Sequence, residues 1–142
     1  MNKTNLLAIL VGFVVSFFLG WLLYAMLLMD YMTAGTMAGI NKSEEEMNFL
    51  GIIIGTLSWV VLLTLLFGKM GIKDFMKGAV AALWIGFLVA LCYDSYFWAA
   101  TNLYNSIEVI CVDVIVMSVS SAITGGVIGW MLGMGNKPAA TA

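Results

Sequence analysis

Four long apolar stretches dominate this sequence of 142 residues. They cover residues 5–29, 47–68, 78–100 and 108–134. An α-helix rises about 1.5 Å per residue, so about 20 residues cross a hydrocarbon core about 30 Å thick. The chain is 63% hydrophobic and 10% charged, against about 45–50% and about 25% in soluble domains. The sequence therefore predicts an all-α polytopic membrane protein, a single transmembrane domain over residues 1–142 with a disordered tail at 135–142.

The lysines predict how the four helices are oriented. Threading four helices places Lys3, Lys69, Lys73, Lys77 and Lys137 on one side of the membrane. The other side carries Lys42 with Asp30, Glu44, Glu45 and Glu46. Cytoplasmic loops carry the excess of Lys and Arg. We therefore expect an antiparallel bundle in the inner (plasma) membrane with both termini cytoplasmic. Segment 30–46 is then an external loop, in which Ser43 and Glu46 form a capping box that opens the second helix.

Small residues spaced by four predict the helix contact faces. In lipid, helices associate through close packing, and Gly, Ala and Ser allow their backbones to approach. The ladders are Gly12, Ser16 and Gly20; Gly51 and Gly55; Gly78, Ala82, Gly86 and Ala90; and Ser121, Gly125, Gly129 and Gly133. Such faces are typical of a compact bundle, or of one that also packs against a partner.

Two aspartates lie within the apolar stretches. Asp94 continues the third ladder by one step of four, and Asp113 is reached backwards from Ser121 through Met117. Both are expected near the external ends of neighbouring helices, where their carboxylates could meet. An ionisable residue in a membrane helix costs several kcal/mol and is a candidate functional site. Alternatively, each accepts hydrogen bonds from nearby hydroxyls and fixes the helix pairing, or reaches water at the interface.

Aromatic residues gather at the same level as the aspartates. The group contains Trp21, Tyr24, Tyr93, Tyr96, Phe97, Trp98 and Tyr104. The ordinary interpretation is the aromatic belt at a membrane interface. The alternative is an outward-facing pocket for an amphipathic or cationic ligand, with Asp94 as the counter-charge. Tyr24, Tyr96 and Asn102 are the other candidate site residues.

Several function classes have no support in the sequence. Histidine is absent, which removes the commonest acid–base and metal-binding side chain. Cys92 and Cys111 lie in apolar segments without companion ligands, so they predict neither a disulfide framework nor a zinc site. The net charge of −2 is small and scattered, unlike that of a nucleic-acid-binding chain. We expect no catalytic residues, metal, cofactor or nucleic-acid partner.

Several short strings resemble those of a known family. They are FFLGWLLYAMLLMDYM in the first helix and, later, YDSYFWAATNLYN, CVDVIVMSV and GGVIGWMLG. The chain resembles a family of small bacterial four-helix integral membrane proteins of unknown function. Asp94, Thr101, Asn102 and Asp113 fall on the polar positions that the resemblance implies are shared. It implies the four-helix fold and brings no assigned activity.

Two functions fit these features. The first is a non-enzymatic inner-membrane protein, either an accessory subunit of a larger membrane complex or a self-associating homo-oligomer in the lipid bilayer. The second is a small oligomeric carrier or channel in which Asp94 and Asp113 bind protons, a cation or a cationic solute.

Overall fold

The computed structural model describes residues 3–134, where the regular structure is helical apart from one isolated bridge between Thr36 and Tyr104. The elements in chain order are α1 (Lys3–Gly20), the π-helix η1 (Trp21–Leu27), α2 (Met29–Gly35), the 3-10 turn η2 (Glu44–Glu46), α3 (Phe49–Met70), α4 (Phe75–Ala100) and α5 (Ile107–Met134). Four spans are long and apolar enough to cross a membrane: Lys3–Leu27, α3, α4 and α5. This confirms the predicted all-α class and its four membrane-length apolar helices. The expected tail, residues 135–142, lies outside the described residues.

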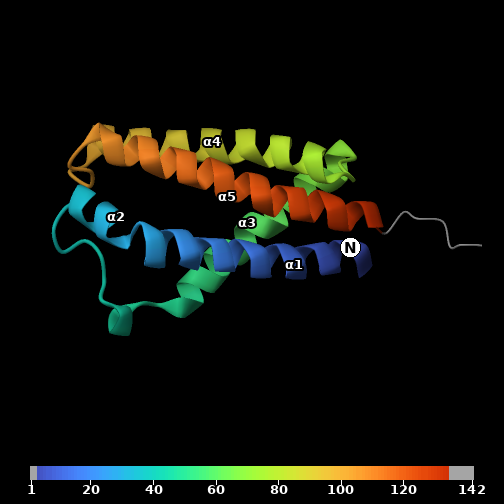
Figure 1. The fold of residues 1–142 in the computed structure, drawn as a ribbon, viewed down its shortest axis with the longest axis horizontal. Helices are drawn as coiled ribbons and strands as arrows, with labels where there is room; N and C mark the ends of the chain where they lie inside the picture. The colour runs from blue at the N-terminus through green and yellow to red at the C-terminus, as the bar shows by residue number, and fades with distance from the viewer. Residues whose placement is uncertain (1–2, 135–142) are drawn as a thin grey trace, which may run out of the picture.

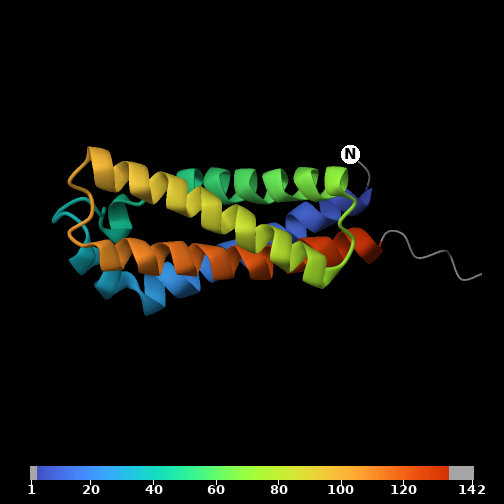
Figure 2. The same cartoon turned by 90° about the horizontal axis from the view of Figure 1, so that it is seen from above.

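Two ends of the molecule can be distinguished (Figures 1 and 2). The start of α1, the connection from α3 to α4 and the end of α5 lie at one end, which we call the lysine end. The opposite end, which we call the turn end, carries α2 and the turn of residues 101–106. α4 and α5 lie side by side in both views, and α1 packs on α5.

The first helix differs from its predicted form. Instead of one α-helix over residues 5–29, α geometry ends at Gly20 and π geometry continues to Leu27. The Leu28 N–H donates to the Leu23 carbonyl at 2.9 Å, five residues back, which is the hydrogen bond of a π-helix. Segment 30–46, predicted as a loop, contains most of α2 and all of η2. The connection between the first two long helices therefore contains regular structure, which apolar length alone did not predict.

The starts of α3 and α4 are capped by side chains. Asn48 accepts a hydrogen bond from the Gly51 N–H at 3.2 Å, and Asp74 accepts one from the Lys77 N–H at 3.0 Å. Each cap satisfies one of the free N–H groups of a first turn. The Ser43 hydroxyl does donate to Glu46, at 3.1 Å, but this pair caps the short turn η2 and lies before the start of α3.

The contact between α4 and α5 is built from small residues. The buried positions of α4 are Gly78, Ala82, Gly86, Ala90 and Asp94. A Cβ atom added at Gly86 would meet the Ser121 side chain and the Met117 carbonyl, and one at Gly78 would meet the Gly125 carbonyl. On α5, a Cβ at Gly129 would meet Asp74 backbone and one at Gly133 would meet the Lys73 carbonyl. The two backbones therefore approach so closely that side chains at these glycines do not fit.

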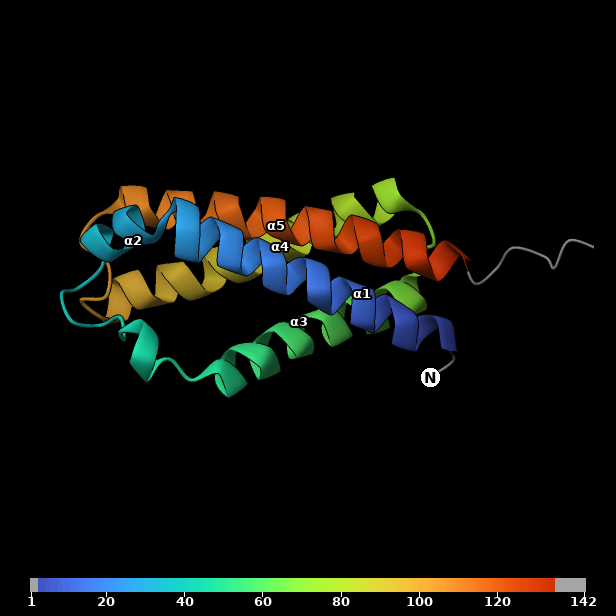
Figure 3. The same cartoon turned by 60° about the horizontal axis from the view of Figure 1, so that its bottom comes forward.

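The α3 helix is attached through its second half alone. Its buried residues are Val60, Leu63, Thr64 and Phe67. A Cβ atom added at Gly12 of α1 would meet Val60 at 3.0 Å and Ile128 of α5 at 2.8 Å. The first half of α3 lies apart from the other long helices (Figure 3). α1, α3 and α5 thus form a second core near the lysine end.

Three residues of the predicted packing faces make no such contact. Gly51 and Gly55 are exposed. A Cβ added at Gly55 or Gly20 would have no atom within 4 Å, and one at Gly51 would meet Asn48 alone, at 4.0 Å. Ser16 is half-buried. The second ladder therefore does not pack within this chain, because the half of α3 that carries it diverges from the other helices.

Candidate functional site

Asp94 and Asp113 lie together near the turn end. Asp94 is on the buried face of α4 and is 5% exposed, whereas Asp113 of α5 is half-buried. The two carboxyl groups lie close enough to interact electrostatically. The sequence pattern that placed both aspartates on contact faces of neighbouring helices thus corresponds to a meeting of the two carboxylates.

Two tyrosines from distant parts of the chain donate to these carboxylates. The Tyr24 hydroxyl, from η1, donates to Asp113 Oδ1 at 2.8 Å. The Tyr104 hydroxyl, from the turn between α4 and α5, donates to Asp94 Oδ1 at 2.7 Å. Both distances are ordinary for O–H···O hydrogen bonds. We call Asp94, Asp113, Tyr24 and Tyr104 the carboxylate cluster.

The cluster leaves one buried oxygen without a donor. Asp94 Oδ2 is buried and has no hydrogen-bond partner, although Oδ1 of the same carboxyl is bonded to Tyr104. Buried polar atoms are nearly always paired in folded proteins, so an orphaned carboxylate oxygen calls for an explanation. The arrangement therefore lacks one donor, at Asp94 Oδ2.

Tyr104 is held in its neutral form by its surroundings. Burial raises the pKa of the Tyr104 hydroxyl well above its usual value, and the hydrogen bond to Asp94 and the charges of Asp94 and Asp113 raise this pKa further. A phenolate here would face two carboxyl groups and lose the bond to Asp94. Tyr104 therefore stays a hydrogen-bond donor at every physiological pH.

Residues 35–37, at and after the end of α2, are hydrogen-bonded to the turn that carries Tyr104. The Met37 N–H donates to the Leu103 carbonyl, and the Asn105 N–H donates to the Gly35 carbonyl, both at 2.8 Å. The Asn105 side chain also donates to the Thr36 carbonyl at 2.8 Å. These bonds join the end of α2 to residues 103–105. They fix the position of the turn, and with it the position of the Tyr104 ring.

Two of the predicted site residues lie outside the cluster. Tyr96 is 67% exposed, and Asn102 is exposed as well. Tyr24 was predicted as a site residue and bonds Asp113. Tyr104 was grouped with the aromatic residues but not among the site residues. A phenol in the short turn directly after the Asp94 helix was the signal that could have found it.

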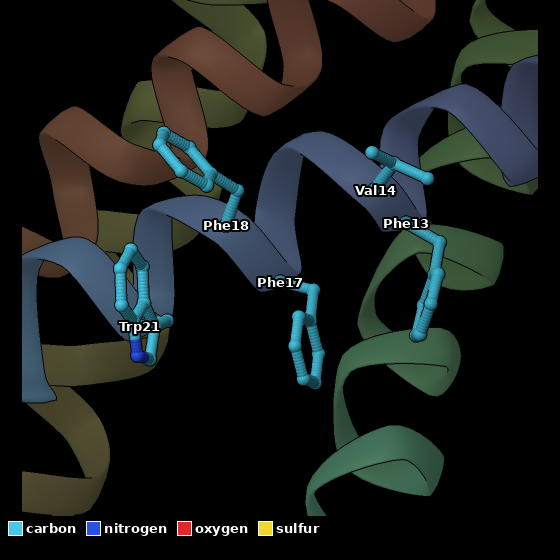
Figure 4. A pocket seen from close by; sticks show the side chains of 5 residues that line it. All are labelled: Phe13, Val14, Phe17, Phe18 and Trp21. Atoms are coloured by element: carbon cyan, nitrogen blue, oxygen red, sulfur yellow. The ribbon is translucent and has the colours of Figure 1, made fainter.

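The other aromatic residues of the group lie mostly on the surface. Trp21, Tyr93, Tyr96 and Trp98 are each at least half exposed. A separate hollow of about 290 Å³ lies along α1 and is lined by Phe13, Val14, Phe17, Phe18 and Trp21 (Figure 4). Phe13 and Phe17 extend from α1 toward the side of α3, and Phe18 points the other way. This hollow has apolar walls and contains no member of the carboxylate cluster.

Comparison with known proteins found no matching family model, no matching curated protein and no matching solved structure. The resemblance to small bacterial four-helix membrane proteins therefore stays a prediction from sequence.

Proposed function

We propose that the chain crosses the inner membrane four times as an antiparallel bundle with both termini in the cytoplasm. Short connections, residues 71–74 and 101–106, join successive long helices. Among the described residues, Lys3, Lys69, Lys73 and Lys77 belong to the lysine end, while Asp30, Glu45 and Glu46 belong to segments of the turn end. This distribution favours a cytoplasmic lysine end and an external turn end.

Cysteine labelling in intact cells tests this orientation. In a background with Cys92 and Cys111 changed to Ser, we expect Lys42→Cys to react with a membrane-impermeant maleimide before lysis. Lys73→Cys should react after lysis alone. The opposite order would reverse the bundle, and labelling of both positions before lysis would contradict the four-helix topology.

We further propose that the protein is non-enzymatic and works by association, with a second copy of itself as the partner. The observation that carries this proposal is the unpacked first half of α3. Gly51 and Gly55 lie four apart on exposed surface there, between exposed apolar side chains such as Leu50 and Ile54. In lipid such a face gains nothing from hydrophobicity, but it allows the close backbone approach that holds helices together.

Crosslinking in native membranes tests the association. We expect the wild-type chain to yield a dimer and Gly55→Leu to reduce its amount strongly. Gly68→Leu is the matched control, because Gly68 is an exposed α3 glycine with open space around it at the lysine end. A wild-type chain that stays monomeric contradicts self-association. A crosslink to a different protein at Gly55 would instead favour an accessory subunit.

A small oligomeric carrier or channel is the second candidate function, favoured by the paired carboxyl groups within membrane-length helices. Flux of protons or cations into liposomes is the measurement. We expect Asp94→Asn and Asp113→Asn to lower it and Asp30→Asn, at an exposed position on α2, to leave it unchanged. Equal flux in all variants would end this candidate.

A further inference from the structure

We propose that the carboxylate cluster binds one proton, shared between the Asp94 and Asp113 carboxyl groups. This proposal goes beyond self-association, and it names the ligand of the site on which the second candidate function rests. It concerns occupancy of the site, so it holds whether or not the proton is ever carried across the membrane.

The number of hydrogen-bond donors around the two carboxyl groups indicates that one proton is bound. The carboxyl groups have four oxygen atoms, and the two Oδ1 atoms each accept a tyrosine hydroxyl. Asp94 Oδ2 is buried without a partner, and the Asp113 carboxyl lies close enough to Asp94 for the two groups to interact electrostatically. Two ionised carboxylates would offer acceptors alone at this contact and would repel each other. One proton on either group supplies the missing donor and removes half of the negative charge.

Within residues 3–134, no cationic side chain belongs to the surroundings of the pair. Apart from the pair itself and Lys77 at the start of α4, the titratable or charged residues on the neighbouring elements are Cys92, Tyr93 and Tyr96 of α4, Glu108 and Cys111 of α5, Tyr24 of η1, Asp30 and Tyr31 of α2, and Tyr104 of the turn. None of these side chains carries a positive charge. Of the six basic residues in the chain, Lys42 lies in an exposed stretch before α3, Lys3, Lys69, Lys73 and Lys77 belong to the lysine end, and Lys137 lies outside the described residues.

A metal ion fits the cluster less well than a proton. No group of three His, Cys, Asp or Glu side chains able to hold a metal occurs among residues 3–134. Hard cations such as Ca²⁺ take six or more oxygen ligands. Here both tyrosine oxygens point a hydrogen at a carboxylate, so they occupy the Oδ1 atoms without acting as ligands.

The tight helix packing between the pair and the lysine end also favours a proton over a larger ligand. The next contacts along α4 and α5 are Ala90 and then Gly86 against Ser121, where even a methyl group at Gly86 would not fit. A solute would need space between these helices, whereas a proton needs none.

Infrared spectroscopy of the full chain in lipid nanodiscs tests the proposal directly. At neutral pH we expect the C=O stretching band of one protonated carboxylic acid per chain, because exposed Asp and Glu are ionised there. Asp94→Asn and Asp113→Asn should each abolish the band, since the new amide supplies the donor and leaves the other carboxyl ionised. Glu108→Gln, at an exposed position on the same helix as Asp113, should leave the band unchanged.

A milder variant keeps the test valid if the Asn variants fold poorly. Tyr104→Phe removes the hydroxyl that donates to Asp94 and keeps both carboxyl groups, so the band should persist at neutral pH. A band that is absent from the wild-type chain from mildly acidic to mildly alkaline pH overturns the proposal. So does a band that survives both Asn substitutions, or one that added Na⁺ or Ca²⁺ removes at constant pH.

The outcomes separate this inference from the proposed functions. The band reports proton occupancy in a single chain, so a monomeric protein with the band contradicts self-association alone. Unchanged flux with the band present contradicts the carrier alone. Dimers or flux without the band contradict the shared proton alone.

Discussion

The pair of α4 and α5 differs from α3 in how it uses glycine. Gly78, Gly86 and Gly125 each face backbone or side-chain atoms of the opposite helix so closely that a Cβ would collide. Gly51 and Gly55 have the same spacing of four, yet they face no other helix of the chain. Small residues at this spacing permit close approach, but they do not determine which neighbour approaches. Glycine spacing therefore indicates where a helix can pack, and the tertiary structure decides whether it does so within the chain.

The largest effect should come from adding volume to the α4–α5 contact. Gly86→Val would force the two backbones apart, because the new side chain meets Ser121 and the Met117 carbonyl. We expect a loss of about 3 kcal/mol in the free energy of unfolding, at the upper end of overpacking effects. Gly55→Val should change this free energy by less than about 0.5 kcal/mol. Equal losses in reversible unfolding in detergent would remove the distinction between the two regions.

Removing the Tyr104 hydroxyl should have the next largest effect. Tyr104→Phe deletes the hydrogen bond to Asp94, and we expect a loss of about 1.5–2 kcal/mol, because hydrogen bonds to charged or partly charged groups exceed neutral ones. Thermal unfolding compared with Tyr93→Phe, at a 62% exposed position of α4, measures it. An equal shift in both variants would contradict a structural role for the cluster.

The raised pKa of Tyr104 predicts a dependence of stability on alkaline pH. Its pKa is higher in the folded than in the unfolded chain, so above about pH 10 the folded state holds a proton that the unfolded state has released. Stability from this group is fully present below about pH 10 and decreases as pH rises further. Tyr104→Phe should flatten this part of the stability curve. An identical alkaline slope in both proteins would show that Tyr104 titrates normally.

Loosening α2 should have a smaller and local effect. Asn105→Ala removes the side-chain hydrogen bonds to the Ala34 and Thr36 carbonyls, and we expect about 1 kcal/mol less protection of residues 29–40. Hydrogen exchange followed by mass spectrometry measures it. Protection of the α4–α5 contact should not change, and a uniform loss across the chain would contradict the local effect.

The smallest effect should come from the helix caps. Asn48→Ala should cost about 0.5–1 kcal/mol, the usual value of an N-cap. Because the first half of α3 is unpacked, we expect the loss to appear as faster exchange near residue 51 without a change in global unfolding. Asp74→Ala removes the corresponding cap of the well-packed α4 and should lower global stability by a similar amount. Two equal global losses would show that α3 unfolds together with α4.

The sequence predicted the four membrane-length helices to within a few residues, because apolar length is a local property. It did not predict η1 or α2. Both take part in contacts far along the chain: Tyr24 of η1 bonds Asp113, and the Gly35 carbonyl at the end of α2 accepts from the Asn105 N–H.

The candidate site was predicted in part, for a reason found in helix geometry. Asp94 and Asp113 follow small-residue ladders, so their shared contact face could be read from spacing. Tyr96 follows Asp94 by two residues, and a turn of about 200° places it on the opposite side of the helix, where it is exposed. Tyr104 reaches Asp94 through a turn whose path no periodicity describes.

The hydrogen bond from Tyr24 to Asp113 joins residues 89 positions apart, and this separation has a consequence for biogenesis. During synthesis, α1 and η1 enter the membrane long before α5 exists. The Tyr24 hydroxyl therefore has no Asp113 acceptor until α5 has been inserted, and the hydrogen bond forms after both helices are in the membrane. Asp94 meets Tyr104 only ten positions later, so the hairpin of α4 and α5 can satisfy one carboxyl by itself. Closure of the Tyr24 bond therefore marks the moment at which the first and last helices have assembled, and its loss should leave an inserted but incompletely assembled chain for membrane proteases to recognise.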